Sequence, residues 1–245
     1  MQGIDRERYL GWDAWRMRRG GLELVVVPQI GGRVMNVVWR GEDLLFVHPE
    51  LAGKVVDVTA TEDKRTLGFL LWGGEKTWLA PQSRWLDELP SLDLDSGPYT
   101  LDVEGECIVL TSPVDRESGI QIVRTIAWLA DAEGWTLTHR LINRGSTTTE
   151  CAPWGVTMLV RPGRVYLPTT ARSPFPEGVK TFVTQPGSVE SRERVVRVDD
   201  GIVTIDCTGP GAFKYGVDPG AGWMLGVVAQ KHGYVGVHKS VDAAP

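Results

Sequence analysis

The sequence predicts an all-β protein, an antiparallel β-sandwich that forms a single domain over residues 1–245, with residues 1–20 as an N-terminal extension. Short runs of β-branched and aliphatic residues recur along most of the chain, and turn signals rich in Gly, Pro, Asn and Asp separate them. Helical periodicity is weak everywhere except in residues 4–19, and the strand–helix alternation of a parallel sheet is not seen. We therefore expect under about a tenth of the residues to be helical.

The expected strands follow one another at short intervals. In chain order they are LELVVVPQ, RVMNVVW, LLFV, YTLDVE, CIVLT, IQIVRTIAWL, WTLTHRLIN, GVTMLV, VVRV, IVTIDC, WMLGVVAQ and YVGVHKSV. Most of the turns between them contain glycine, which adopts a positive φ without strain. The longest loops are expected at residues 48–68, 84–98 and 168–193.

One expected strand, IQIVRTIAWL, shows how the sheets are covered. Ile120, Ile122, Arg124 and Ile126 alternate with residues that are mostly apolar too, so neither face of this strand is wholly polar. A strand of this kind is covered on both sides, as in stacked sheets.

Composition and charge exclude several classes of function. The net charge of -5 argues against a nucleic-acid partner, whose phosphates require a basic surface. No apolar run is long enough to cross a membrane, and the N-terminus has charge throughout and no apolar core of the signal-peptide kind. The sequence therefore predicts a cytoplasmic protein with no membrane partner, and it does not fix the oligomeric state.

Cysteine and histidine patterns indicate neither a metal site nor a cofactor site. The three cysteines are widely spaced with no CxxC pair, and the four histidines form no HxH or HExxH pattern. No GxSxG, GxxxxGK[ST] or helix-opening GxGxxG motif occurs. We expect no metal and no cofactor.

The stretch LLWGGEKTWLAPQSRW, residues 70–85, concentrates aromatic surface beside charge. A loop or bulge at its two glycines could turn both Glu75 and Lys76 toward one cleft, with Trp78 beneath a sugar ring and Gln82 supplying an amide. The alternative is structural: the tryptophans close one end of the sandwich, and Glu75 and Lys76 are ordinary surface charges.

Four blocks of the sequence resemble a known superfamily. PQIGGRVMNVVWRGEDLLFV is similar to the glycine-rich opening hairpin of galactose mutarotase-like (aldose 1-epimerase-like) proteins, and WGGEKTWLAPQSRW and NRGSTTTECAPWGVTML, together with FKYG, resemble a bacterial subgroup of that superfamily. The resemblance spans roughly residues 20–240 and implies a galactose mutarotase-like antiparallel β-supersandwich with a carbohydrate cleft on one concave face.

The resemblance also implies where the chain departs from true mutarotases, which use a glutamate as base and a histidine as acid. PWGVTML places Trp154 where the acid histidine would stand, and an indole N–H cannot protonate a leaving oxygen at neutral pH. The segment that carries the family's glutamate would follow near Lys239, where this chain reads SVDAAP. Trp154 is expected in the cleft or at its edge, near Trp78, as a residue that contacts the ligand.

Candidate roles follow from these patterns. Glu75 is the candidate base, and Lys76 or His238 the candidate acid or electrostatic partner. Arg33, Lys214 and Lys239 are candidates for ligand contacts, and for the first two a structural ion pair is an equal alternative to holding a carboxylate or phosphate.

The expected partner is a small molecule, a sugar or an acidic sugar. The chain could be an epimerase or mutarotase relative, a carbohydrate-binding module without chemistry, or the same fold used on a non-sugar molecule. If Glu75 faces the cleft, Glu75→Gln weakens ligand binding by about 1.5–3 kcal/mol and changes folding stability little.

Overall fold

The computed structural model describes residues 3–182, 195–211, 213–218, 221–230 and 233–240, the last range by its backbone alone. It is 49% strand and 8% helical, and every strand pairing is antiparallel, so the expected all-β class is confirmed. None of the described helices is long or apolar enough to cross a membrane.

The chain divides into two compact units, unit 1 over Met1–Met158 and unit 2 over Leu159–Pro245. Each is described by itself, and the single domain expected from the sequence stays a prediction.

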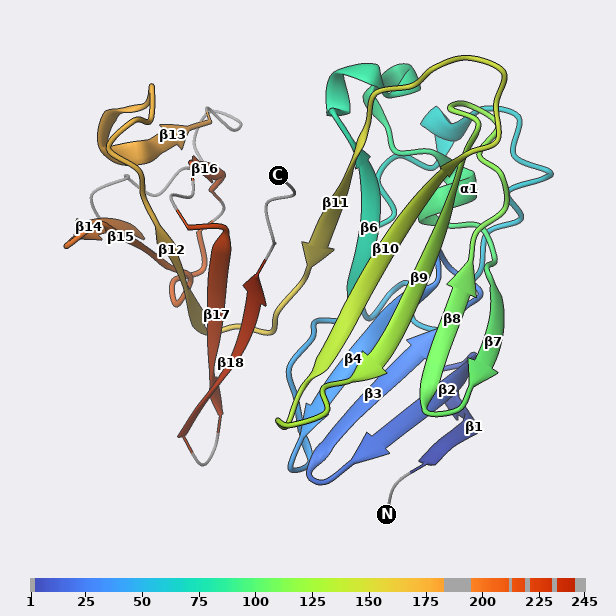
Figure 1. The fold of residues 1–245 in the computed structure, drawn as a ribbon, viewed down its shortest axis with the longest axis horizontal. Coiled ribbons are helices and arrows are strands. Elements are labelled where there is room, and N and C mark those ends of the chain that lie inside the picture. Colours follow the sequence, from blue (N-terminus) through green and yellow to red (C-terminus); the bar gives the residue numbers. More distant parts are fainter. Residues whose placement is uncertain (1–2, 183–194, 212, 219–220, 231–232, 241–245) are drawn as a thin grey trace. The chain divides into compact units, whose positions relative to one another are not determined.

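Unit 1 contains a seven-stranded and a four-stranded antiparallel sheet (Figure 1). The large sheet has the order β1-β2-β3-β4-β6-β11 with β5 beside β4, and the small sheet has the order β10-β9-β8-β7. The strands of unit 1 are β1 (Gly3–Tyr9), β2 (Trp12–Arg19), β3 (Leu22–Val27), β4 (Arg33–Trp39), β5 (Glu42–Asp43), β6 (Glu75–Ala80), β7 (Thr100–Glu104), β8 (Cys107–Thr111), β9 (Ile120–Trp128), β10 (Trp135–Asn143) and β11 (Ala152–Thr157). Its short helices are η1 (Lys64–Thr66), η2 (Gln82–Arg84), η3 (Leu86–Glu88) and α1 (Leu92–Asp95).

Unit 2 contains a five-stranded sheet of order β14-β15-β12-β17-β18 and a separate β13-β16 pair. Leu167, Val203, Ile205 and their apolar neighbours form its core. Its elements are β12 (Gly163–Pro168), η4 (Pro176–Gly178), β13 (Val179–Thr181), β14 (Val196–Asp199), β15 (Ile202–Asp206), β16 (Tyr215–Val217), β17 (Trp223–Gln230) and β18 (Gly233–Ser240).

Three expectations about local structure need correction. Residues 4–19 form strands β1 and β2, because their polar residues pair across a hairpin, as Arg18 does with Asp5. Residues 44–47 make isolated bridges and no continuous strand. The chain turns at Gly73 and Gly74, which both have a positive φ, as expected, but Glu75 and Lys76 then belong to the regular strand β6 and do not turn toward one cleft.

The central strands β3 and β4 of the large sheet are buried on both faces, in keeping with their continuous apolar runs. On one face Trp12, Val25, Met35 and Trp72 form a core cluster. Trp12 and Trp72 meet edge to face, with ring centroids 6.4 Å apart, so the loop before β6 contributes a core residue to the sheet. In β9 the side chains of Ile120, Ile122, Arg124 and Ile126 are all buried, as its alternation predicted.

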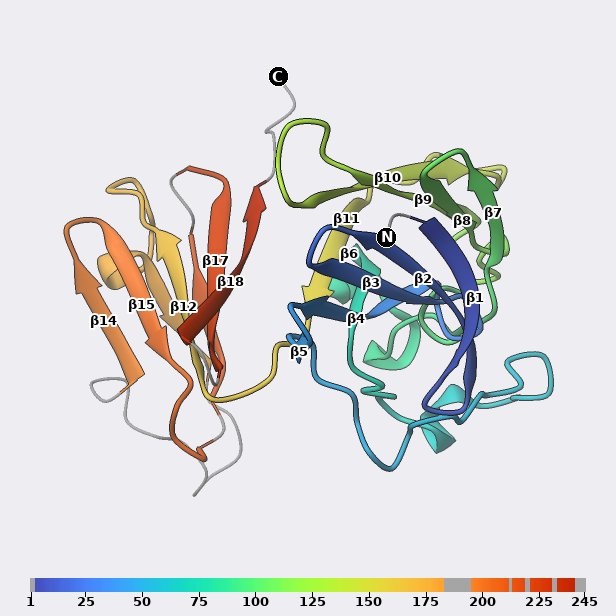
Figure 2. The same ribbon diagram turned by 90° about the horizontal axis from the view of Figure 1, so that it is seen from below.

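A buried ion pair connects the two sheets of unit 1, which Figure 2 shows on opposite sides of its interior. Arg124 of β9 donates to the Glu75 carboxylate of β6 and to the carbonyl of Gly32, and no part of Arg124 is exposed. Burying two charges is costly unless each keeps its partner, so this pair fixes how β9 lies against the large sheet.

Two glycines allow the backbone to approach closely around this interior. A Cβ on Gly31, whose φ is +71°, would lie 2.2 Å from the Asp95 carbonyl oxygen. A Cβ on Gly73, whose φ is +105°, would lie 2.0 Å from the carbonyl oxygen of Phe46. Both positions therefore require glycine for space as well as for conformation.

Glu75→Gln should lower the free energy of unfolding by about 3 kcal/mol, because it leaves the buried Arg124 guanidinium without its carboxylate. Urea denaturation at pH 7 measures the change. Asp13→Asn is the control, since the Arg8–Asp13 pair is mostly exposed and should contribute under about 1 kcal/mol. Equal, small effects of the two substitutions would contradict an interior ion pair.

Candidate functional site

A pocket of about 530 Å³ lies within unit 1, beside the chain that leads from β6 to α1. Its lining comes from β6 and the 3-10 turns after it, from the residues just before and within α1, and from loops 115–118 and 149–151. One wall is aromatic and another is polar. The pocket thus brings the tryptophan-rich stretch of residues 70–85 together with loops far away in the sequence.

Trp78 and Trp85 form the aromatic wall. Their ring centroids are 5.1 Å apart at 80°, so the two indoles present surfaces at nearly a right angle. Trp154 lies directly across from Trp78 in the β6–β11 ladder and stacks on Trp85, with centroids 5.6 Å apart. The three tryptophans thus form one cluster on three separate segments of unit 1.

The indole N–H groups of this wall are already used within the protein. Trp78 Nε1 donates to Asp95 Oδ1 at 2.7 Å, and Trp85 Nε1 donates to the carbonyl of Leu79 at 2.7 Å. The wall therefore offers apolar ring surface, and hydrogen bonds to a ligand must come from the other side of the pocket.

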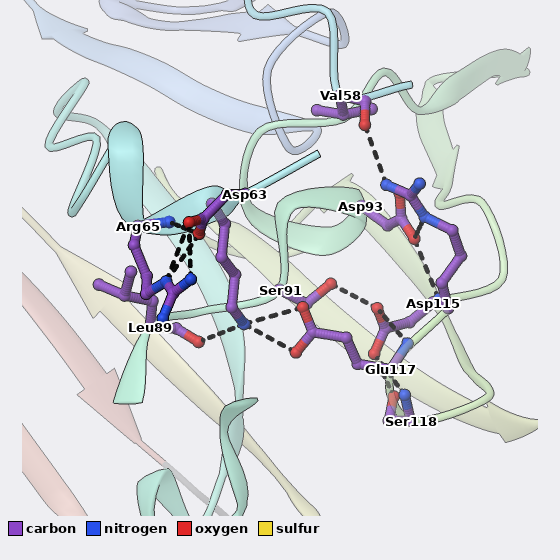
Figure 3. Close-up of polar contacts among 11 residues, drawn as sticks. Val58, Asp63, Arg65, Leu89, Ser91, Asp93, Asp115, Glu117 and Ser118 are labelled. Carbon is purple, nitrogen blue, oxygen red and sulfur yellow. Dashed lines mark hydrogen bonds and ion pairs between the residues drawn. The ribbon is translucent and has the colours of Figure 1, made fainter. Parts of the chain in front are cut away.

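Asp115 organises the polar side (Figure 3). Ser91 Oγ and Ser118 Oγ both donate to its carboxylate, and the Ser118 backbone N–H donates to Oδ2 at 2.9 Å. Asp115 is only 2% exposed, and through these bonds it holds the segment before α1 against loop 115–118.

Glu117 (Figure 3) and its neighbour Arg116 attach the same loop to two further segments. Both carboxylate oxygens of Glu117 lie 2.8 Å from Lys64 Nζ. Arg116 Nε donates to Asp93 Oδ2 at 2.9 Å, and its guanidinium also donates to the Val58 carbonyl at 3.0 Å.

Each cationic group at the pocket is matched by a carboxylate. Besides Lys64 and Arg116, Arg84 lies 3.4 Å from Glu150. The pocket lining therefore carries partnered charges together with the hydroxyl groups of Ser83, Ser91 and Ser118.

Glu75 does not reach this pocket. It is 6% exposed, it pairs with Arg124 in the interior between the sheets, and it is absent from the pocket lining. The expectation that Glu75 projects into an open cleft is therefore corrected, because strand alternation directs it to the interior. Its surface-charge alternative is equally incorrect.

Lys76 and Arg33 are buried as well, and both bind Asp95. Lys76 Nζ lies 2.7 Å and Arg33 Nη2 lies 3.0 Å from Asp95 Oδ1. For Arg33 the structural ion pair, one of two alternatives from the sequence, is what the structure contains. Lys76 is 2% exposed and lies over the face of Trp78, so it too is not the cleft residue that was expected.

Burial and neighbouring charges set the pKa values of Lys76 and Asp95. Burial, opposed by the negative charge of Asp95 and aided by the positive charge of Arg33, lowers the pKa of Lys76 to about 8. Burial raises the pKa of Asp95, but Arg33 and Lys76 outweigh it and hold that pKa below its ordinary value. Asp95 is thus an anion, while Lys76 can lose its proton at mildly alkaline pH.

The expected proximity of Trp154 to Trp78 is confirmed, since their ring centroids lie 5.5 Å apart. Trp154 is half-buried and supports the wall from the side of Trp85. Gln82 is exposed on η2 and adjoins lining residues without being one of them, so its ligand contact stays a prediction.

The remaining candidates belong to unit 2. Lys214 is exposed, and its Nζ lies 5.0 Å from the centroid of the Phe182 ring. His238 and Lys239 lie on β18, opposite Leu225 and Met224, and their side chains fall outside the described part of the structure. Their catalytic and binding roles stay predictions.

Sequence reasoning did not identify Ser91, Asp115, Glu117 or Ser118. A local signal exists for two of them: in DRESG, an Asp followed three residues later by Ser and then by Gly is typical of a turn closed by the Asp side chain. Nothing local links that turn to Ser91 or to the tryptophans, because the pairing is tertiary. Among the described residues, no three His, Cys, Asp or Glu side chains lie close enough together to hold a metal ion.

Comparison with known proteins adds little to this description. No family model matches the chain, and no curated protein matches it. Among solved structures, it is similar to the crystal structure of a 4-alpha-glucanotransferase from Thermococcus litoralis, with 12% sequence identity and a TM-score of 0.38. That match covers 96% of this chain and 36% of the other, so the chain spans about a third of that enzyme's length.

Asp115→Ala should loosen loop 115–118, because it removes the acceptor of both serine hydroxyls and of the Ser118 N–H. Hydrogen exchange of the loop amides should become at least about tenfold faster, the effect of losing roughly 1.4 kcal/mol of local stability. Asp102→Ala, on the exposed part of β7, is the control and should leave these amides unchanged. Unaltered exchange in Asp115→Ala would contradict the organising role.

The pKa of Lys76 predicts a pH dependence of folding. Below pH 8 the lysine is protonated in both states, and the cost of burying the charge is fully present. Between pH 8 and 10 the unfolded chain binds more protons here than the folded one, so stability rises with pH by up to about 1.4 kcal/mol per unit. Urea unfolding of wild type and Lys76→Met should show a difference that grows over this range; a constant difference would be inconsistent with the lowered pKa.

Proposed function

We propose that unit 1 binds a carbohydrate in the pocket between the tryptophan wall and loop 115–118. The observation that carries the proposal is the pairing of Trp78 and Trp85, whose N–H groups are already used, with a polar wall of serines and carboxylates. Sugar rings have apolar C–H faces and polar edges, so they fit a pocket with one wall of each kind.

The size of the pocket is also suitable. About 530 Å³ is within the range of small-molecule sites and accommodates one or two sugar rings. One face of Trp85 is covered by Trp154, which fixes the ring and leaves its other surface for a ligand. A wall that is already rigid loses little conformational entropy on binding.

The resemblance of the sequence to galactose mutarotase-like proteins supports the same proposal. On this basis we also propose that the chain is a distant relative of that superfamily. The glycine pair before Arg33 and the antiparallel all-β architecture agree with the resemblance.

The site supports sugar binding without turnover better than it supports isomerisation. Acid–base catalysis requires a proton donor and an acceptor within reach of the sugar, and Glu75 and Lys76 are both buried away from the pocket lining. Glu117 is a partly exposed carboxylate in the lining and is the candidate base if turnover occurs, with Lys64 as its cationic partner.

A thermal-shift screen of glucose, galactose, glucuronate and glucose 6-phosphate tests the proposal. A ligand at about a hundred times its Kd adds roughly 2.7 kcal/mol of stability, which is a clearly measurable shift. Trp85→Ala should weaken binding of the responding sugar roughly tenfold, about 1.4 kcal/mol, by removing the stacking surface.

Trp39→Ala is the matched control, since Trp39 ends β4 as a half-buried tryptophan outside the pocket lining. It should leave sugar affinity unchanged. Polarimetry of the same sugars reports any anomerisation and thereby separates the isomerase from the binding protein. No shift with any of these ligands, or equal weakening by both variants, would count against the pocket.

A further inference from the structure

Trp78 is held by the two charged side chains of Asp95 and Lys76, which also bind each other. Its Nε1 donates to Asp95 Oδ1 at 2.7 Å, Lys76 Nζ lies 3.9 Å from its ring centroid, and Lys76 binds that same Asp95 oxygen at 2.7 Å. The three side chains form a closed triangle of a hydrogen bond, a cation–π contact and an ion pair.

Asp95 is fixed independently of the other two members of this triangle. It ends α1, is 3% exposed, and accepts from Arg33 Nη2 at 3.0 Å. The Arg33 guanidinium also donates to the carbonyls of Ile30, Gly73 and Asp95 itself, so its position is determined by the backbone. The triangle therefore connects a rigid interior to a ring that lines the pocket.

We propose that Asp95 and Lys76 are positioning residues for the ligand site, and that the Lys76 ammonium, by binding both Asp95 and the Trp78 ring, holds that indole in the orientation that forms the pocket wall. The part of this proposal that concerns a ligand rests on the carbohydrate-binding function proposed above. Neither residue lines the pocket, so both act on a ligand through Trp78.

The charged surroundings of Lys76 make this arrangement sensitive to pH. Asp95 on α1 and Arg33 on β4 face its ammonium, β11 contributes no titratable side chain, and Glu75 on β6 is paired with Arg124 of β9. This connected interior contains three cations and two carboxylates. The positive charges therefore exceed the negative charges by one. Lys76 is the group that can remove this excess by losing its proton, because burial lowers its pKa to about 8.

Loss of the Lys76 proton removes the ion pair and the cation–π contact together. Asp95 keeps Arg33 and the Trp78 N–H, so the fold does not depend on that proton. The Trp78 ring is then held by one hydrogen bond in place of the full triangle. The wall is therefore fixed at neutral pH and loosened above about pH 8.

The indole N–H resonances of the ten tryptophans in a ¹H–¹⁵N spectrum test the proposal without any ligand. The Trp78 resonance is the one missing from Trp78→Phe. In the wild type it should shift between pH 6.5 and 9.5 with a midpoint near 8. In Lys76→Arg it should not shift, because a guanidinium keeps its proton throughout this range and can still bind Asp95.

Lys76→Arg is chosen because it preserves the charge, and its thermal unfolding shows whether the fold is retained. Lys76→Met is the second variant, should Arg prove too large for the site. It too should abolish the shift, with the Trp78 resonance in its alkaline position at every pH. A resonance that does not move in the wild type, or that moves with the same midpoint in both variants, would overturn the positioning role.

Calorimetric titration with glucose and galactose supplies the ligand readout. Affinity should weaken roughly three- to tenfold from pH 7 to 9.5 in the wild type, the scale of one lost cation–π contact, and should stay constant in Lys76→Arg. If a sugar binds with an affinity that is independent of pH, the positioning role fails and the proposed function stands. If no sugar binds but the resonance behaves as described, the proposed function fails and the positioning of Trp78 stands.

Discussion

The rest of unit 1 depends on the hydrogen-bonded ion pairs that the buried carboxylate of Asp95 makes. A single oxygen accepts from Arg33 on β4 and from Lys76 and Trp78 on β6, and the residue itself ends α1. A buried carboxylate is tolerated only when its hydrogen bonds are satisfied by donors that are themselves fixed. Because these donors come from β4 and β6 while Asp95 belongs to α1, the sheet, the helix and the pocket wall are held in one relation.

The backbone geometry follows from this requirement. Arg33 reaches the carbonyls of Gly73 and Asp95 because the chain turns at Gly31 and Gly73, where a side chain would strike a neighbouring carbonyl. A separate ion pair, Arg124 with Glu75, fixes the small sheet against the large one in the same way. Together with the two ion pairs of Asp95, it accounts for much of the charge that is buried in a unit whose cores are otherwise apolar.

The pocket combines elements with different sources of rigidity. Its aromatic wall is attached to the buried ionic interior through Trp78 and to the β6–β11 ladder through Trp154. Its polar wall has no regular structure and is held by side-chain bonds between loops, with Asp115 and Glu117 at their centre. An aromatic wall on a sheet facing an adaptable polar loop suits a ligand that offers a C–H face and several hydroxyl groups.

The sequence by itself determined the fold class, because the period of two in runs such as IQIVRTIAWL and the glycine turns between them are local signals of antiparallel strands. It also singled out the residues around Glu75 as unusual, and it identified Trp154 as a neighbour of Trp78. It did not locate the partners of Glu75, Lys76 and Arg33, since a charged residue on a strand reads alike whether it faces solvent, a ligand or a buried counter-ion.

Residues 4–19 show the same limit at the level of secondary structure: their mixed polar pattern fits a helix until the cross-strand ion pairs of β1 and β2 are known. Only the tertiary structure placed Asp95 beside Arg33 and Lys76, and Arg124 beside Glu75. It also placed Asp115 and Ser91 in the same pocket as Trp78 and Trp85. Lys76 and Asp95 are 19 residues apart in the chain, Ser91 and Asp115 are 24 apart, and Glu75 and Arg124 are 49 apart, and no local pattern encodes such distances. Local periodicity decides which residues form strands, and the need to satisfy buried charge decides which side chains meet.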